Sequence, residues 1–557
     1  MGDVSISSSV FSLRSNKVRS VALLAFTAFA AIGPGCGNDE GDGSAATGGS
    51  AGTAGTAGTA GTAGTAGTAG NAGTAGTGGG TGGTGGTGGH AGVGGSSGAT
   101  GGTAGAAGAA GSAGSAGTGG SGGEAVEPPI SCGGQCIFVR PGATGAASGA
   151  DWDNALPSLP SSLVRGRVYL LADGECGAYR FEGATSGSEL LTLRKATIED
   201  HGTDVGWNDA YGDGVALFDG VRFATSHVLL EGTKGGGPGA WNSGHGIEIV
   251  STGAECKDNG ELIGFEPGAA YVTVAHVHAH AQDNDYPMNG VKGTGGNHHL
   301  TFRYDSIHTT FGPTFHIGDW SDVVIERSFL ADVRSTGGDD PFCPHWHAEG
   351  ISSIGTNTNI TIRYNLWDEI GGTAVIAGVN SGGSVDWQIY GNVFARSVTT
   401  IRYYFDAQTT NQHTMDGLRF YNNDIVRMPG SSVGTIAIDA GSDNQVVNNV
   451  WWDNVANTFV MSGVNHDYNL FAGNRRVEGC DPPCEKDEEA AEDESHGQVG
   501  SGDLFVEGYG EPSLSDYHLL GPTEPGQGLP APFDDDPDGT PRGADGNWDR
   551  GAYELSP

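Results

Sequence analysis

Three ionisable residues occupy the same position in short triplets that read small, apolar, then variable: Glu248, Lys292 and His316. Later triplets would continue the row with Ser352, Ile376, Arg402 and Ala437. If the triplets are strands of successive coils, the row stacks at about 4.8 Å per step on one exposed face. A carboxylate, an amine and an imidazole this close can form a general acid/base set. The simpler interpretation, that these residues form a solvent-exposed, charged surface without a catalytic role, stays open.

A long insertion interrupts the row after His316. The step from Phe315 to Ile351 is 36 residues, and it contains histidine, tryptophan and paired aspartates. Long loops of this kind are more often functional than structural. Histidines two positions apart on a strand share a face, so this pair could also bind a metal with either aspartate. The predicted residues are catalytic Lys292, His316, His347 and Arg303; substrate-binding Trp346, His345 and Arg402; and metal-ligating Glu248, Asp339, Asp340 and Glu349.

The elements that must position these residues are short, alternating segments in two columns. The triplets recur with steps of 24 residues from Val291 to Phe315 and from Ile351 to Val375. A second series alternates by two and ends in asparagine, at positions 365, 392, 422, 449 and 469. Val, Ile, Thr and Phe alternating by two exclude a helical repeat. The predicted fold is all-β, a right-handed parallel β-helix with coils of roughly 24 residues, in which the asparagines form a turn ladder.

The N-terminal residues indicate an exported protein with a flexible linker before its folded domain. Basic residues precede a short apolar run, 21–32, which suits a secretory signal and is too short for a membrane span. We therefore expect a signal peptide over 1–35, lipidation of Cys36, and an outer-membrane lipoprotein displayed at the cell surface. The Ala/Gly/Thr-rich stretch that follows lacks the apolar side chains needed to fold. The predicted domains are the signal, a disordered linker over 36–124, and the β-helix over 125–557.

Charge and cysteine content narrow the function classes. The formal net charge is −39, which argues against binding to nucleic acid or to an anionic membrane surface other than through the lipid anchor. We expect a monomer. The close pairs Cys132/Cys136 and Cys480/Cys484 predict small disulfide loops. The pairing of the other three cysteines, Cys176, Cys256 and Cys343, stays open, with one of them expected to be a free, buried thiol.

Two segments carry a resemblance to a known superfamily. The start, Asp151–Leu156 followed by 168–174, and the ending, Asp536–Arg542 followed by Asp549–Glu554, resemble exported bacterial β-helix proteins of the pectate-lyase-like superfamily. The resemblance covers roughly 137–557 and implies the fold. It does not imply one activity, because fold alone does not give function.

Lys292 and His316 also resemble the placement of a lysine and an arginine in the chondroitinase B and alginate lyase family, with His316 in place of the arginine. That likeness implies β-elimination on a uronate polysaccharide with Ca²⁺ held by Glu248. Two alternatives stay open. A polygalacturonase-like hydrolase would use Asp339-Asp340 and Gly244-His245-Gly246, although in reversed order. A surface protein that binds glycans without cleaving them is the other.

Overall fold

The structure is a computed structural model that describes residues 132–182, 187–251, 260–281, 289–310, 312–334, 348–403, 413–429, 436–438, 440–455, 461–475 and 487–555. The chain divides into two units, 1–116 and 117–557, and every described residue belongs to the second. The predicted signal, Cys36 and the linker lie outside the described residues. Among the described residues, no helix is long and apolar enough to cross a membrane.

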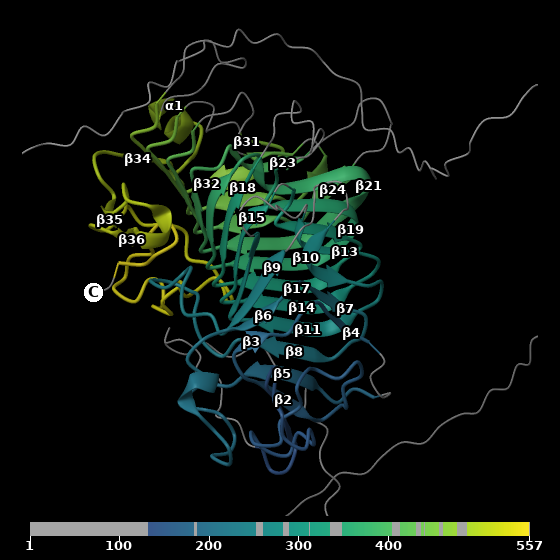
Figure 1. Ribbon diagram of the computed structural model, residues 1–557. Coiled ribbons are helices and arrows are strands. Elements are labelled where there is room, and N and C mark those ends of the chain that lie inside the picture. The colour runs from purple at the N-terminus through teal and green to yellow at the C-terminus, as the bar shows by residue number, and fades with distance from the viewer. Residues whose placement is uncertain are drawn as a thin grey trace, which may run out of the picture. The chain divides into compact units, whose positions relative to one another are not determined.

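The second unit is built from three columns of parallel strands that stack coil upon coil (Figure 1). Column 1 contains β4 (Tyr179–Phe181), β7 (Val221–Phe223), β10 (Glu261–Phe265), β13 (Asn289–Thr294), β16 (Phe315–Gly318), the first parts of β19 (Ile351–Arg363) and β21 (Thr373–Tyr390), β23 (Thr399–Tyr403), β27 (Ile436–Ala437) and β31 (Met461–Ser462).

Column 2 contains β1 (Cys136–Val139), β2 (Val168–Leu171), β5 (Leu191–Lys195), β8 (Val228–Glu231), β11 (Ala270–Ala275), β14 (His298–Arg303), β17 (Ser321–Glu326), the last parts of β19 and β21, β25 (Arg419–Tyr421), β29 (Gln445–Val447) and β32 (Asn465–Asp467). The long strands β19 and β21 run through both columns, and β24 (His413–Asp416) and β28 (Gly441–Ser442) lie between them. Columns 1 and 2 therefore join into one 22-stranded sheet.

Column 3 is a separate 12-stranded sheet that the sequence pattern did not reveal. It contains β3 (Gly174–Glu175), β6 (Ala216–Phe218), β9 (Ile247–Ser251), β12 (Val277–Ala281), β15 (Ser306–Thr310), β18 (Phe329–Val333), β20 (Leu366–Ile370), β22 (Val393–Ala395), β26 (Asp424–Val426), β30 (Val450–Trp452), β33 (Leu470–Ala472) and β34 (Gln498–Gly500).

The strand register confirms the predicted coil spacing. All pairings in the three columns are parallel, and each coil returns to pair with the one before it. In column 1, the residues at the two ends of each predicted step are register partners: Val291 with Phe315, Phe315 with Ile351, Ile351 with Val375, and Val375 with Ile401. The architecture is thus the predicted right-handed parallel β-helix, the hand that parallel crossover connections take.

Inward-facing apolar side chains form the core. Along the first coils of column 1, Phe181 stacks on Phe223 with ring centroids 4.7 Å apart, and Phe223 stacks on Phe265 at 5.0 Å. These rings are buried, and their strand neighbours point outward because successive side chains on a strand alternate. The core stack therefore holds the outward row in register.

A buried asparagine ladder runs through the turns between columns 2 and 3. Asn365, Asn392, Asn423, Asn449 and Asn469 each bond through the side-chain amide to the next rung. The prediction placed Asn422 in this ladder and was off by one residue. Asn422 instead has φ +50°, and its Oδ1 accepts from Trp548 Nε1 at 3.3 Å. The ladder ends at Glu494, whose Oε1 and Oε2 accept from the Asn469 side chain and backbone.

The C-terminal segment packs along the side of the coils. It contains the helix α1 (Asp487–Glu492), a 3-10 turn at Pro512–Leu514, and the antiparallel pair β35 (Phe505–Glu507) and β36 (Asp516–Leu519). A second 3-10 turn, Asp209–Tyr211, lies between β5 and β6 in the chain.

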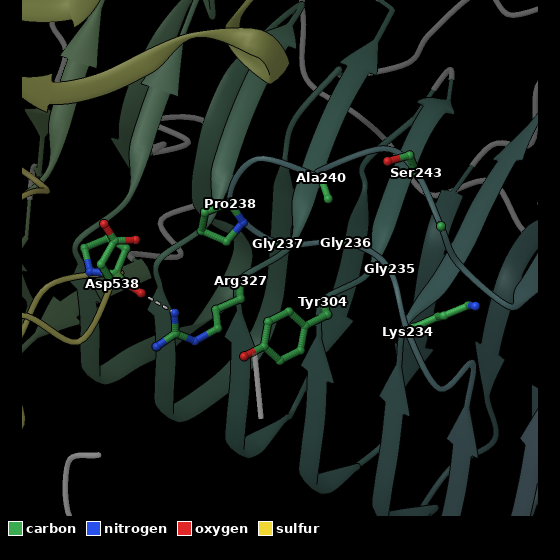
Figure 2. A pocket seen from close by; sticks show the side chains of 12 residues that line it. Lys234, Gly235, Gly236, Gly237, Pro238, Ala240, Ser243, Tyr304, Arg327 and Asp538 are labelled. Atoms are coloured by element: carbon green, nitrogen blue, oxygen red, sulfur yellow. Dashed lines mark hydrogen bonds between the residues drawn. The ribbon is translucent and has the colours of Figure 1, made fainter. Parts of the chain in front are cut away.

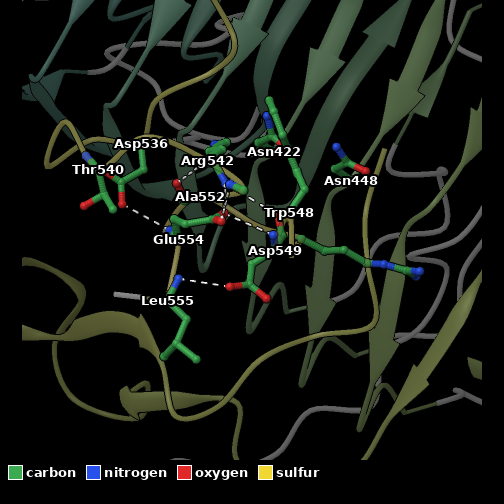
Figure 3. A network of polar contacts seen from close by, with 12 residues as sticks. Asn422, Asn448, Asp536, Thr540, Arg542, Trp548, Asp549, Ala552, Glu554 and Leu555 are labelled. Carbon is green, nitrogen blue, oxygen red and sulfur yellow. Dashed lines mark hydrogen bonds and ion pairs between the residues drawn. The ribbon is translucent and has the colours of Figure 1, made fainter. Parts of the chain in front are cut away.

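The predicted closing motif is one polar network (Figure 3). Asp536 Oδ2 accepts from Glu554 N at 3.1 Å, and Glu554 Oε2 accepts from Asp549 N at 3.0 Å. Asp549 Oδ2 accepts from Leu555 N at 3.0 Å, and Asp536 Oδ1 accepts from Thr540 N at 2.7 Å. These carboxylates therefore satisfy backbone donors and fold the C-terminal segment.

One of the predicted disulfides is present: Cys132 is bonded to Cys136. Cys176 is a free, half-buried thiol, and burial raises its pKa to about 12. A thiol with so high a pKa is a poor nucleophile, because the thiolate is the reactive form. Cys256, Cys343, Cys480 and Cys484 lie outside the described residues.

Candidate functional site

The predicted outward row exists on column 1 from Lys292 onward. Lys292 on β13 is in register with His316 on β16, and His316 with Ser352 on β19. The row continues through Ile376 to Arg402 and Ala437. Lys292 points outward, because its neighbours Val291 and Gly293 face the buried core. The side chain of Arg402 lies outside the described part of the chain, so only its backbone register is known.

Glu248 does not belong to this row, and that part of the prediction is wrong. Glu248 lies on β9 in column 3, opposite His278. The rung that precedes Lys292 is Gly264 on β10, and the rungs before it are Arg222 and Arg180. The error arose because β9 and β13 share the same small-apolar-variable pattern although they belong to different columns. The observed row therefore begins with two arginines that the sequence analysis missed.

Burial changes the acid–base properties of both central residues. Desolvation lowers the pKa of Lys292, and the nearby Arg222 guanidinium lowers it further. Desolvation lowers the pKa of His316 to about 4, with Lys292 adding to the effect. Both shifts favour the uncharged form. At neutral pH His316 is a neutral imidazole, and a larger fraction of Lys292 is free amine than in an ordinary lysine.

The two arginines at the start of the row are paired with glutamates. Arg180 Nη2 lies 3.6 Å from Glu266 Oε1, and Arg222 Nη1 lies 3.4 Å from the same oxygen. Arg180 also pairs with Glu182, and Arg222 with Glu261. About half of each arginine side chain is exposed, so solvent weakens these pairs. An anionic ligand could therefore compete for the guanidinium groups.

Two adjoining depressions follow the row and form a groove. The larger, about 450 Å³, is lined by Arg222, Glu261, Glu266 and Lys292, among others. The smaller, about 300 Å³, is lined by Arg180, Arg222 and Glu261. Arg222 and Glu261 line both, so the two depressions adjoin. This row groove, defined by Arg180, Arg222, Lys292 and the adjoining His316, is the candidate functional site.

Other predicted site residues lie elsewhere. Arg303 is on the same coil as Lys292 but at the end of β14 in column 2, where its Nη2 lies 3.8 Å from the buried Glu231 Oε2. It is therefore placed to compensate a buried carboxylate. Glu349 is 3% exposed, and its backbone carbonyl accepts from Thr314 N. The loop residues Asp339, Asp340, His345, Trp346 and His347 lie outside the described residues.

A separate depression of about 430 Å³ lies beside a glycine-rich loop (Figure 2). It is lined by the 234–238 loop, Tyr304 and Arg327, and closed by Pro537 and Asp538. Arg327 donates to the Pro537 carbonyl, so the C-terminal segment forms one wall. Gly236 has φ +78°, and a Cβ there would lie 2.1 Å from the Tyr304 carbonyl oxygen. The loop therefore requires glycine to pack, which is a sufficient reason for its composition.

Column 3 carries a histidine cluster that the sequence analysis did not single out. His278 and His280 on β12 flank Ala279, and His308 follows on β15. The sequence signal was available: histidines two apart in an alternating strand must share a face. Glu248 was predicted as a metal ligand, but its place opposite His278 was not, because the two residues are 30 positions apart in the chain.

Comparison with known proteins gives likenesses of fold only. No protein-family model matches the chain, and no curated protein matches its sequence. Among solved structures, pectate lyase Pel9A aligns with TM-score 0.39 and 12% identity, over 76% of this chain and 96% of that one. The PL6 family alginate lyase AlyGC aligns with TM-score 0.32 and 13% identity, over 66% and 53%. Endopolygalacturonase I from Stereum purpureum aligns with TM-score 0.22 and 11% identity, over 66% and 93%. The assignment of the fold rests on the strand register.

Proposed function

We propose that this domain is a polysaccharide lyase that binds an anionic, uronate-containing glycan along the row groove and cleaves it by β-elimination. The observation that carries the proposal is the register pairing of Lys292 with His316 beside an arginine-lined groove. Together they supply a base, a neutral imidazole and cations for a sugar carboxylate. The coil spacing of about 4.8 Å is close to the length of one pyranose unit, so successive sugars can follow successive rungs.

In the proposed reaction, Arg222 pairs with the carboxylate of the sugar that is attacked. Arg222 and Lys292 line the same depression, although they lie two rungs apart. Charge pairing stabilises the enolate-like intermediate that forms when the C5 proton leaves. Of the predicted metal ligands that the structure describes, Glu248 lies in column 3 and Glu349 is buried, so the proposal assigns the role of the cation to Arg222.

Lys292 acts as the base. Its free amine takes the C5 proton, the C4–C5 double bond forms, and the bond from C4 to the glycosidic oxygen breaks. The leaving oxygen accepts a hydrogen bond from the neutral imidazole of His316 and takes its proton from solvent, and the Lys292 ammonium then returns its proton to solvent. The lowered pKa of Lys292 increases the fraction of free amine near neutral pH, as general-base catalysis requires.

The hydrolase alternative has less support among the described residues. His245, in the Gly244-His245-Gly246 motif, is buried, and its Nε2 donates to the Tyr304 carbonyl at 3.1 Å. It does not line the row groove. Asp339 and Asp340 lie outside the described residues.

The test is to incubate the purified protein with alginate, pectate and chondroitin, with Ca²⁺ or with EDTA, and to follow the ultraviolet absorbance of the unsaturated product. Lys292→Ala should lower kcat by roughly 10²–10⁴-fold, the usual contribution of a general base. Arg222→Ala should raise KM and lower kcat/KM. Lys234→Ala is the matched control, because Lys234 is an exposed lysine at the glycine-rich loop.

Four results would contradict the proposal. One is the absence of unsaturated product with every uronate glycan. Another is a Lys292→Ala variant with the kcat of the Lys234→Ala control. New reducing ends without unsaturation would instead indicate a hydrolase, and glycan binding without any cleavage would indicate a binding protein.

A further inference from the structure

Four side chains that bind metals through nitrogen or oxygen converge on column 3, away from the row groove. Glu248 on β9 lies opposite His278 on β12, and His280 on β12 lies opposite His308 on β15. The four residues thus come from three consecutive rungs and point outward, since the alternate positions on these strands are buried. No other group of three possible metal ligands lies this close together among the described residues.

The ligand atoms are close enough to share one ion. Single ligand atoms of Glu248, His278 and His280 all lie within 4.8 Å of one another. His280 Nε2 lies 2.7 Å from Glu248 Oε1, and His278 Nε2 lies 2.7 Å from His308 Nε2. The rings of His278 and His280 stack with centroids 4.3 Å apart, and those of His280 and His308 lie 5.4 Å apart.

The hydrogen bond of His280 Nδ1 indicates that a cation lies between His280 Nε2 and the Glu248 carboxylate. His280 Nδ1 lies 2.8 Å from the Ala281 carbonyl oxygen, which can only accept, so Nδ1 carries the proton. In the neutral imidazole, Nε2 then presents a lone pair toward a carboxylate oxygen. Two acceptors at 2.7 Å need a cation between them, either a proton or a metal ion. A backbone carbonyl that orients an imidazole in this way is typical of metal-binding histidines.

We propose that this cluster binds one divalent transition-metal cation of the Zn²⁺ class through Glu248, His278 and His280, with His308 beside His278. Imidazole nitrogens suit Zn²⁺, Co²⁺, Ni²⁺ or Cu²⁺, whereas Ca²⁺ takes oxygen ligands. Tetrahedral Zn²⁺ with ligands at about 2.0–2.1 Å places its donor atoms about 3.3 Å apart. The His280–Glu248 pair at 2.7 Å would therefore open by roughly 0.6 Å on binding, a shift within the reach of side-chain torsions.

The surroundings favour access and fix the geometry. The side chains of His280 and Glu248 are 19% and 28% exposed, so an ion can enter from solvent. The buried His245 ring stacks on His278 with centroids 5.7 Å apart. His245 is itself held by its bond to the Tyr304 carbonyl. The site does not depend on the proposed lyase activity, because it shares no residue with the row groove.

The experiment uses the full chain without an affinity tag, stripped with EDTA and dialysed. Zn²⁺ binding is measured by equilibrium dialysis with elemental analysis, and Co²⁺ is added as a visible-absorption probe. The variants are Glu248→Gln, which keeps the shape of the side chain, and His280→Ala. The matched control is His298→Ala, which removes one imidazole from a neighbouring pair on column 2 where Nδ1 atoms of His298 and His299 lie 2.8 Å apart.

We expect about one Zn²⁺ per chain and visible Co²⁺ bands in the wild type and in His298→Ala. Glu248→Gln and His280→Ala should weaken Zn²⁺ binding by at least roughly tenfold. A parallel variant, His345→Ala with His347→Ala, tests the loop pair. Retention of Zn²⁺ in this double variant supports the proposed site. Loss of Zn²⁺ in the double variant, together with retention in Glu248→Gln, overturns the proposal.

Absence of stoichiometric Zn²⁺ from the wild type would also overturn the proposal, because a proton would then join His280 to Glu248. Circular dichroism and the metal-free Tm show whether each variant is folded. If His280→Ala does not fold, the isosteric Glu248→Gln decides the result.

Discussion

Replacing Asn392 by alanine tests whether the asparagine ladder holds the coils together. Asn392 is fully buried. Its Oδ1 accepts from the backbone N and the Nδ2 of Asn365, both at 3.0 Å. Its Nδ2 donates to the Ile362 carbonyl at 2.9 Å and to Asn423 Oδ1 at 3.0 Å. Alanine removes all of these bonds without supplying replacements.

The expected cost follows from the groups left behind. The buried Asn365 backbone N–H loses its acceptor, at roughly 1–3 kcal/mol, and each of the other lost bonds costs about 0.5–1.5 kcal/mol. The free energy of unfolding should therefore fall by about 5 kcal/mol. An unfolding entropy of about 2.1 cal/mol/K per residue over roughly 420 residues amounts to about 0.9 kcal/mol/K, so Tm should fall by about 5–6 °C.

Differential scanning calorimetry measures this shift. The control is Asn465→Ala, because Asn465 is an exposed asparagine on β32 of the same column. An exposed substitution of this kind changes stability by less than about 0.5 kcal/mol. If Asn392→Ala shifts Tm by less than 1 °C, like the control, the ladder does not stabilise the coil and the reasoning fails.

Two further predictions concern pH. The folded pKa of His316 is about 4, below the ordinary 6.5, so the unfolded chain binds more protons in this window and stability falls as pH drops from 6.5 to 4. The Tm of His316→Gln should fall less than that of the wild type between pH 7 and 4. Equal decreases in Tm would contradict the lowered pKa of His316. Burial raises the pKa of Asp424 to about 8, so its contribution to stability is lost as pH rises from about 4 to 8. Asp424→Asn should keep the 3.1 Å bond from Ala552 N and raise Tm more at pH 8 than at pH 5, and a gain independent of pH would argue against a buried titrating carboxyl.

Much of the fold was predictable because its signal is local and repeated. Alternation by two identifies the outward residue of each strand, and the hydrophobic pattern sets the register between coils. That is why Lys292, His316, Ser352 and Arg402 appear in register as predicted. The asparagine positions were also visible, except where Asn422 and Asn423 adjoin and only the turn geometry shows which one faces inward.

The local sequence pattern was sufficient to predict the all-β solenoid and the outward row from Lys292 onward. The column that each strand joins follows only from the tertiary structure. A triplet such as 246–248 has the same alternation in column 1 and in column 3, so the turns before and after it determine the face on which Glu248 lies. For the same reason, the arginines of the row and the histidine cluster became visible only when strands 28 to 42 residues apart in the chain were stacked, because contact between rungs depends on the path of the chain and not on its local pattern.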